Sequence, residues 1–216
     1  MTARARAVRP TWRRLVANEA AIWRSLFLWS IRRRPGQGAT ARAFPYVKQV
    51  QPLLFAFLFV SVLELPIVHF LVPWEPAKLV LLVLGAWGLL WMLGYIAAMR
   101  VFPHLIDDDG LHIRHGASLD LLLRWDQIAA VRADRDRVPT NKPLQFDGDS
   151  DTRAAKVAIL KQTRIAVELA DPTRLDHPDG TEHVIAVKLY VDDARGFVAA
   201  ARERLAQRDD HGQAAA

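Results

Sequence analysis

Residues 79–116 read LVLLVLGAWGLLWMLGYIAAMRVFPHLIDDDGLHIRHG, and the pattern of apolar residues changes within this stretch. The segment Leu79–Met99 is almost entirely apolar and long enough to cross a hydrocarbon core of about 30 Å as a helix. After Arg100 the apolar residues fall into short runs, and Asp109-Gly110 and Gly116 are typical of turns between strands. The stretch therefore predicts a membrane-spanning helix that leads directly into a β-rich domain.

A second apolar segment, PLLFAFLFVSVLELPIVHFLVP at residues 52–73, precedes the first and is equally long. Only a few residues around WEPAK separate the two segments, which predicts a transmembrane hairpin with spans at 52–73 and 79–99. Eleven Lys and Arg residues precede Pro52, against one acid, Glu19. Because short basic flanks remain cytoplasmic, we expect a multi-pass protein of the cell (inner) membrane with both termini in the cytoplasm. The preference for Arg over Lys suggests a bacterial source.

Composition excludes several classes of function. The chain has no cysteine, so it holds no disulfide and no thiolate metal site. Acidic residues outnumber basic residues after Arg100, which gives no electrostatic reason to expect nucleic acid as a partner. No nucleotide-binding, hydrolase or zinc-protease motif is present, and His104, His112 and His115 are poorly spaced for a shared metal. We therefore expect no cofactor and no enzymatic activity.

Glu64 lies near the middle of the first predicted span, where a carboxylate costs roughly 2.5 to 3.5 kcal/mol. At similar depth the second span carries Trp87 and Trp91, whose indole N–H groups would hydrogen-bond Glu64. This structural role is the first interpretation. The alternatives are a proton or ion relay in a transporter subunit, and docking to another membrane protein.

The basic N-terminal region predicts an amphipathic helix at about residues 11–34, with Thr11 as N-cap and a stop at Pro35-Gly36. One face is apolar and the other basic, and Glu19 falls within the apolar arc. Such a helix either lies on anionic lipid at the cytoplasmic surface or packs on the protein's own spans or soluble domain. The candidate membrane-surface residues are Trp12, Arg13, Arg14, Trp23, Arg24, Arg32, Arg33 and Arg34.

The region 100–207 predicts an α+β domain. Short apolar runs indicate strands near residues 101–107, 111–115, 119–125, 128–133, 156–160, 164–169 and 184–191. The polar segment at 139–153 predicts a loose loop. A closing amphipathic helix follows, capped by Asp192 or Asp193, and residues 208–216 are expected to be a disordered tail.

The runs DGLHIRHG and RWDQIAAV resemble the signature of bacterial pleckstrin-homology-like (PH-like) domains in small membrane proteins. The residues that carry this resemblance are Gly110, Leu111, Ile113, Gly116, Trp125, Ile128 and Val131. The resemblance implies a β-barrel or sandwich whose open corner is plugged by the C-terminal helix, with Trp125, Ile128 and Val131 in the core. It implies a role in assembling or recruiting proteins rather than catalysis.

Four regions are therefore predicted: a basic cytoplasmic arm at 1–50, a transmembrane hairpin at 51–99, a cytoplasmic PH-like domain at 100–207 and the tail at 208–216. The expected function is a non-enzymatic membrane protein that presents the domain to another membrane or cytoplasmic protein. Membrane lipids are expected partners, and self-association is possible for such a hairpin. The alternatives are a sensor of anionic lipid or envelope state acting through the Arg/Trp-rich helix, and the transporter subunit that uses Glu64.

Overall fold

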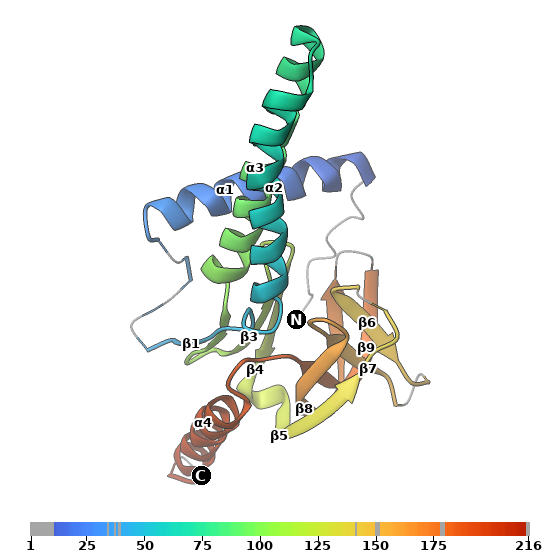
Figure 1. Cartoon of the computed structure of the whole chain (residues 1–216). Helices are drawn as coiled ribbons and strands as arrows, with labels where there is room; N and C mark the ends of the chain where they lie inside the picture. Colours follow the sequence, from blue (N-terminus) through green and yellow to red (C-terminus); the bar gives the residue numbers. More distant parts are fainter. Residues whose placement is uncertain are drawn as a thin grey trace.

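The structure is a computed structural model that describes residues 11–33, 35–36, 38, 40–140, 142–149, 152–177 and 180–214. These residues form an α+β arrangement of four α-helices, one 3₁₀ helix and nine strands. A long helical hairpin stands on two β-sheets, one further helix lies across the hairpin, and the last helix covers the sheets on the other side (Figure 1).

The hairpin consists of α2 (Gln51–Leu71) and α3 (Glu75–Val101). Both helices are long and apolar enough to cross a membrane, and most of their large apolar side chains are exposed. The turn occupies only residues 72–74, since α3 begins at Glu75 with Pro76 in its first turn, earlier than the predicted start at residue 79. Leu65 of α2 packs against Gly85 of α3, where a Cβ would lie 2.8 Å from the Leu65 Cδ2 atom. The exposed apolar surface is consistent with a lipid environment and not with the core of a soluble protein.

Helix α1 (Thr11–Ser30) packs on α3 and crosses the hairpin (Figure 1). The crossing centres on Gly94, where a Cβ would lie 2.6 Å from Ile22 Cγ2 and 3.0 Å from the Ile22 carbonyl oxygen. Ile22 and Ser25 are buried at this contact. The sequence allowed this helix either to lie on lipid or to pack on the protein itself, and in the structure it packs on α3.

The first sheet has the order β1-β2-β3-β4, with all neighbours antiparallel. Its strands are β1 (Arg42–Phe44), β2 (His104–Ile106), β3 (Gly110–His115) and β4 (Leu119–Arg124). Strand β1 comes before the hairpin in the chain and β2 comes after it. The sheet therefore joins the two ends of the hairpin, and residues assigned from sequence to the N-terminal arm belong to the first sheet.

The second sheet has the order β5-β8-β9-β7-β6. The 3₁₀ helix η1 (Trp125–Gln127) leads into β5 (Ile128–Arg137), and the remaining strands are β6 (Leu144–Asp147), β7 (Ala154–Val157), β8 (Gln162–His177) and β9 (Gly180–Leu189). Strands β7 and β9 run parallel, whereas the other pairs are antiparallel. The predicted loose loop at 139–153 contains β6, which the sequence analysis missed.

The core lies between the two sheets and α4 (Ala194–Ala214). Phe197 of α4 is buried and contacts the ring of Phe44 edge to face, with centroids 5.1 Å apart. Asp193 caps the helix by accepting the Gly196 N–H at 3.0 Å. The two sheets do not close into a barrel, because their strands form two separate hydrogen-bonded sets. Helix α4 continues to Ala214, so residues 208–214, predicted to be a disordered tail, are helical instead.

Candidate functional site

The residues predicted for the membrane surface are only partly described. Arg24, Arg32 and Arg33 are exposed, and Arg32 adopts a left-handed conformation (φ 55°) just after the end of α1. The side chains of Trp12, Arg13 and Arg14, and the whole of Arg34, lie outside the described residues. Trp23 is half-buried, with its ring 4.9 Å from that of Trp87. Trp23 of this predicted surface therefore contacts α3.

The predicted contact between Glu64 and the tryptophans of α3 is wrong. Trp91 donates its indole N–H to Glu19 of α1 at 2.8 Å, and Trp23 donates to the other oxygen of Glu19 at 3.0 Å. Glu64 is exposed on α2, and within the described part of the chain no hydrogen bond reaches it. The error has a physical reason: α1 covers the face of α3 that carries Trp91, so the nearest carboxylate comes from α1. The position of Glu19 within the apolar face of α1 is thereby explained, because its carboxylate binds two indole N–H groups there.

The residues that carry the PH-like resemblance lie in the first sheet and its junction with the second. Leu111, Ile113, Trp125, Ile128 and Val131 are buried in the core. The indole N–H of Trp125 donates to the carbonyl oxygen of Asp107 at 2.9 Å. The two glycines serve the backbone: a Cβ on Gly110 would lie 2.1 Å from the Leu123 oxygen, and Gly116 has φ 53°. These residues position the fold, and none of them lines either of the two pockets described below.

A buried polar cluster connects the base of the hairpin to the domain. The Tyr46 hydroxyl accepts the Gly116 N–H at 2.7 Å and donates to the Phe102 carbonyl oxygen at 3.2 Å. His104 accepts the Arg114 N–H at Nδ1 (3.0 Å) and therefore donates from Nε2 to the Tyr190 oxygen (3.0 Å). Burial lowers the pKa of His104 to about 3 and that of His115 to about 4, so both imidazoles are neutral at neutral pH.

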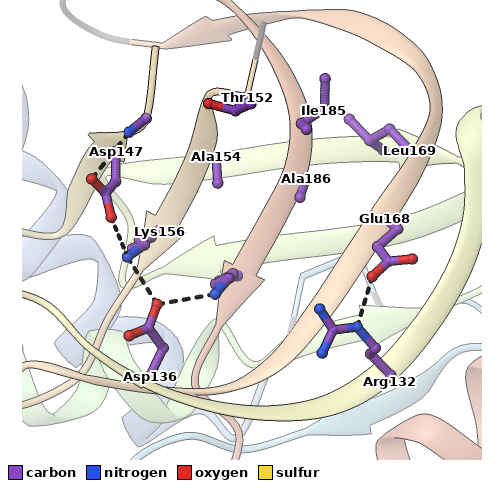
Figure 2. A pocket seen from close by; sticks show the side chains of 12 residues that line it. Arg132, Asp136, Asp147, Thr152, Ala154, Lys156, Glu168, Leu169, Ile185 and Ala186 are labelled. Atoms are coloured by element: carbon purple, nitrogen blue, oxygen red, sulfur yellow. Dashed lines mark hydrogen bonds and ion pairs between the residues drawn. The ribbon is translucent and has the colours of Figure 1, made fainter.

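The candidate functional site is a hollow of about 540 Å³ on the outer face of the second sheet (Figure 2). Its floor follows from the strand register: Glu168, Ala186, Ala154 and Asp147 lie side by side across four strands. The two alanines have no side chain beyond Cβ, so the sheet is depressed between charged walls. An incoming segment of a partner would therefore reach close to the sheet backbone.

Ion pairs form the walls of the hollow. Lys156 bonds Asp136 at 2.8 Å and Asp147 at 2.7 Å, and its side chain is only 8% exposed. Lys188, its register neighbour on β9, bonds Asp136 at 3.0 Å. Arg132 bonds Glu168 at 2.7 Å on the opposite wall, as Figure 2 shows.

These contacts fix the charge states in the hollow. The hydrogen bonds from Lys156 and Lys188 hold the pKa of Asp136 well below its usual range. Burial disfavours the charged form of Lys156, but its bonds to Asp136 and Asp147 outweigh burial and raise its pKa. Asp136 and Lys156 are therefore both charged near pH 7. Because each cation already has a carboxylate partner, the hollow suits a surface with its own paired charges better than a single strong anion.

The hollow was not predicted from the sequence, although a signal was present. Lys156 and Lys188 each interrupt an apolar run, in AAKVAIL and IAVKLYV, and a lysine inside such a run needs a partner when buried. The partners come from β5 and β6, and no local pattern pairs these strands with β7 and β9. No protein-family model, no curated protein and no solved structure matches this chain.

Proposed function

We propose that the chain is a membrane-anchored, non-enzymatic adaptor. In this proposal α2 and α3 cross the cell membrane of a bacterium as a hairpin, both termini lie in the cytoplasm, and a PH-like domain at the base docks another protein. The observation that carries the proposal is the hairpin itself: two long helices with exposed apolar side chains, joined at one end to a domain with a polar surface. The basic residues before Pro52 support the cytoplasmic orientation.

The connection between hairpin and domain supports an adaptor with a fixed geometry. Tyr46, Val47, Met99, Ile159 and Tyr190 form one buried cluster, against which Val50, Leu54 and Tyr95 pack. The cluster thus combines residues from both helices or their ends with Ile159, which follows β7, and Tyr190, which follows β9. A domain held by a packed cluster presents the hollow at a defined position relative to the membrane.

Membrane topology is tested with single cysteines, because the chain has none of its own. Glu75→Cys places a thiol at the tip of the hairpin, and Ala117→Cys places one in the exposed turn between β3 and β4. We expect a membrane-impermeant maleimide to label Glu75→Cys in intact cells and Ala117→Cys only after permeabilisation. Labelling of both positions, or of neither, in intact cells would contradict the proposed topology.

Docking at the hollow is tested with a photo-reactive amino acid. The residue is placed at Thr152, which lines the hollow, or at Ala117 as the matched control on the other sheet. In native membranes we expect a discrete adduct from Thr152 that Glu168→Arg abolishes, and no such adduct from Ala117. Equal adducts from both positions, or none from Thr152, would exclude the hollow as the docking site.

The alternative of a lipid sensor that acts through a free α1 is less well supported, because Ile22 and Glu19 bind α1 to α3. A peptide of residues 10–36 that fails to bind anionic vesicles would remove this alternative. The transporter alternative depends on Glu64, and an intact phenotype of Glu64→Gln would remove it.

A further inference from the structure

A second, smaller pocket of about 310 Å³ lies between the end of β5 and the start of β8. Its lining residues are Arg135, Asp136, Arg137, Gln162, Thr163 and Arg164. The β5–β8 register shifts here, between Ala133 and Asp136, so the strands are locally irregular and the pocket opens beside this irregularity.

The pocket has an excess of positive charge. Arg135 and Arg137 are exposed, and within the described residues no carboxylate forms an ion pair with either. Arg164 lies over the ring of Tyr190, with 4.9 Å from its guanidinium carbon to the ring centroid. The carboxylate of Asp136 bonds Lys156 at 2.8 Å and Lys188 at 3.0 Å, so these two lysines of the hollow already compensate its negative charge. Two guanidinium groups without a carboxylate partner, with that of Arg164 beside them, therefore line the pocket.

The pocket also contains a hydroxyl without a partner. Thr163 is 1% exposed, and its Oγ1 is buried with no hydrogen-bond partner among the described residues. Burying a hydroxyl without a hydrogen bond costs free energy, so such a group in a native structure points to a missing partner. A ligand oxygen in the pocket would supply it.

The pocket lies next to the base of α2. The turn between β7 and β8 consists of Leu160 and Lys161, both with positive φ (45° and 61°). Ile159 before it belongs to the same buried cluster as Val47, just ahead of α2. The Lys161 carbonyl accepts the Val138 N–H at 3.0 Å, which ties the end of β5 to this turn.

A second link runs through Asp192. Its carboxylate accepts the backbone N–H groups of Val47 and Lys48 at 3.1 and 3.0 Å, and Arg164 donates to its carbonyl oxygen at 3.5 Å. Two independent contacts therefore hold the pocket at the point where α2 begins.

We propose that this pocket binds the phosphate of an anionic phospholipid headgroup in the leaflet that α2 enters. The planar guanidinium groups of Arg135, Arg137 and Arg164 match phosphate oxygens in geometry, and Thr163 completes the site as a hydroxyl donor. Leu160, 39% exposed at the tip of the adjacent turn, is placed to contact the lipid. The inference rests on the proposed membrane insertion of the hairpin.

The test uses the full chain in mild detergent and counts bound lipids by native mass spectrometry. The probes are phosphatidylglycerol, phosphatidylcholine and inorganic phosphate. We expect one phosphatidylglycerol to remain bound, phosphatidylcholine to bind more weakly, and millimolar inorganic phosphate not to displace the lipid. The double variant Arg135→Gln/Arg137→Gln should weaken phosphatidylglycerol binding by roughly tenfold or more.

Two further variants make the test specific. Arg195→Gln removes the same charge from an exposed arginine of α4 and should leave binding unchanged. Thr163→Val removes the hydroxyl at nearly constant volume, and we expect weaker lipid binding with no loss of thermal stability in the lipid-free protein. Equal losses for Arg195→Gln and the double variant, or no effect of Thr163→Val on binding, would overturn the proposal.

One outcome distinguishes a lipid phosphate from a soluble phosphate, and another distinguishes failure of the lipid site from failure of the proposed membrane insertion. Binding of inorganic phosphate without retention of phosphatidylglycerol would show that the ligand is a soluble phosphate, and would overturn the lipid assignment. Cysteine labelling at Glu75 and Ala117 reports membrane insertion independently, so a correctly inserted protein without retained lipid refutes the pocket alone.

Discussion

The carboxylate of Glu19 accepts a hydrogen bond from the indole N–H of Trp91, 72 positions later in the chain, at 2.8 Å. The second oxygen of Glu19 accepts the indole N–H of Trp23, one turn further along α1. Two tryptophans from different helices therefore bind one carboxylate, and this contact fixes the position of α1 along α3.

Removing either partner of this hydrogen bond should loosen α1. Leaving a buried hydrogen-bonding group without its partner costs about 1 to 3 kcal/mol, so Trp91→Phe and Glu19→Leu should each lower the free energy of unfolding within that range. The measurement is a double-mutant cycle by denaturant unfolding in detergent. If the losses in free energy of unfolding from the two substitutions simply add, Glu19 and Trp91 do not act together.

A side chain at Gly94 should displace α1. A Cβ at this position would lie 2.6 Å from Ile22 Cγ2, too close for any real contact. Gly88 is the matched control on the same helix, because a Cβ there meets no atom within 4 Å. We expect Gly94→Ala to make α1 sensitive to limited proteolysis and Gly88→Ala to leave it protected. Equal protection of both variants would contradict the observed crossing.

Stability should fall as the pH drops from 7 to 5, because His115 must stay neutral when folded. Its pKa is about 4 in the folded state and about 6.5 in the unfolded chain, so the unfolded chain binds more protons over this range. The loss should be about 2 kcal/mol for this residue. His115→Phe keeps a ring against Tyr46 and should reduce the pH dependence of denaturant unfolding by this amount, whereas His183→Gln, at an exposed position, should not.

The Tyr46 hydroxyl should be important for the junction between hairpin and domain. Tyr46→Phe leaves the Gly116 N–H and the Phe102 carbonyl without this partner in a buried site, which costs about 1 to 3 kcal/mol. Tyr190→Phe is the control, since the Tyr190 ring lies in the same buried cluster and no described hydrogen bond uses its hydroxyl. Thermal unfolding of the two variants compares them. An equal loss for both would assign the effect to packing.

Elements marked by a regular spacing of apolar residues, or by an unbroken apolar run, could be predicted from the sequence. The hairpin, the amphipathic helix and the buried Trp125 and Ile128 all belong to this class. Strand β1 could not be found, because Arg42–Phe44 is three residues long and forms only through pairing with β2, some 60 positions away. Such pairing is tertiary information that no local window contains.

The contact of Glu19 with Trp91 and the charged hollow of the second sheet were not predicted, for a related reason. The Glu19 contact depends on which face of α3 is covered by α1. The helical periodicity of α1 alone places Glu19 among apolar residues and does not reveal its partner Trp91. The hollow depends on the order β5-β8-β9-β7-β6, which brings Asp136 to Lys156 across two intervening strands. Charge pairing across a sheet follows strand order, and strand order is not local.

The pairing of β1 with β2 bears on how such a chain is made. The ribosome produces Arg42–Phe44 before the hairpin, and its partner His104–Ile106 only after both helices. If the hairpin spans a bilayer as proposed, failure of one helix to insert would leave the two strands on opposite sides, and the first sheet could not assemble. In the proposed topology, completion of the first sheet would therefore report that both helices had inserted.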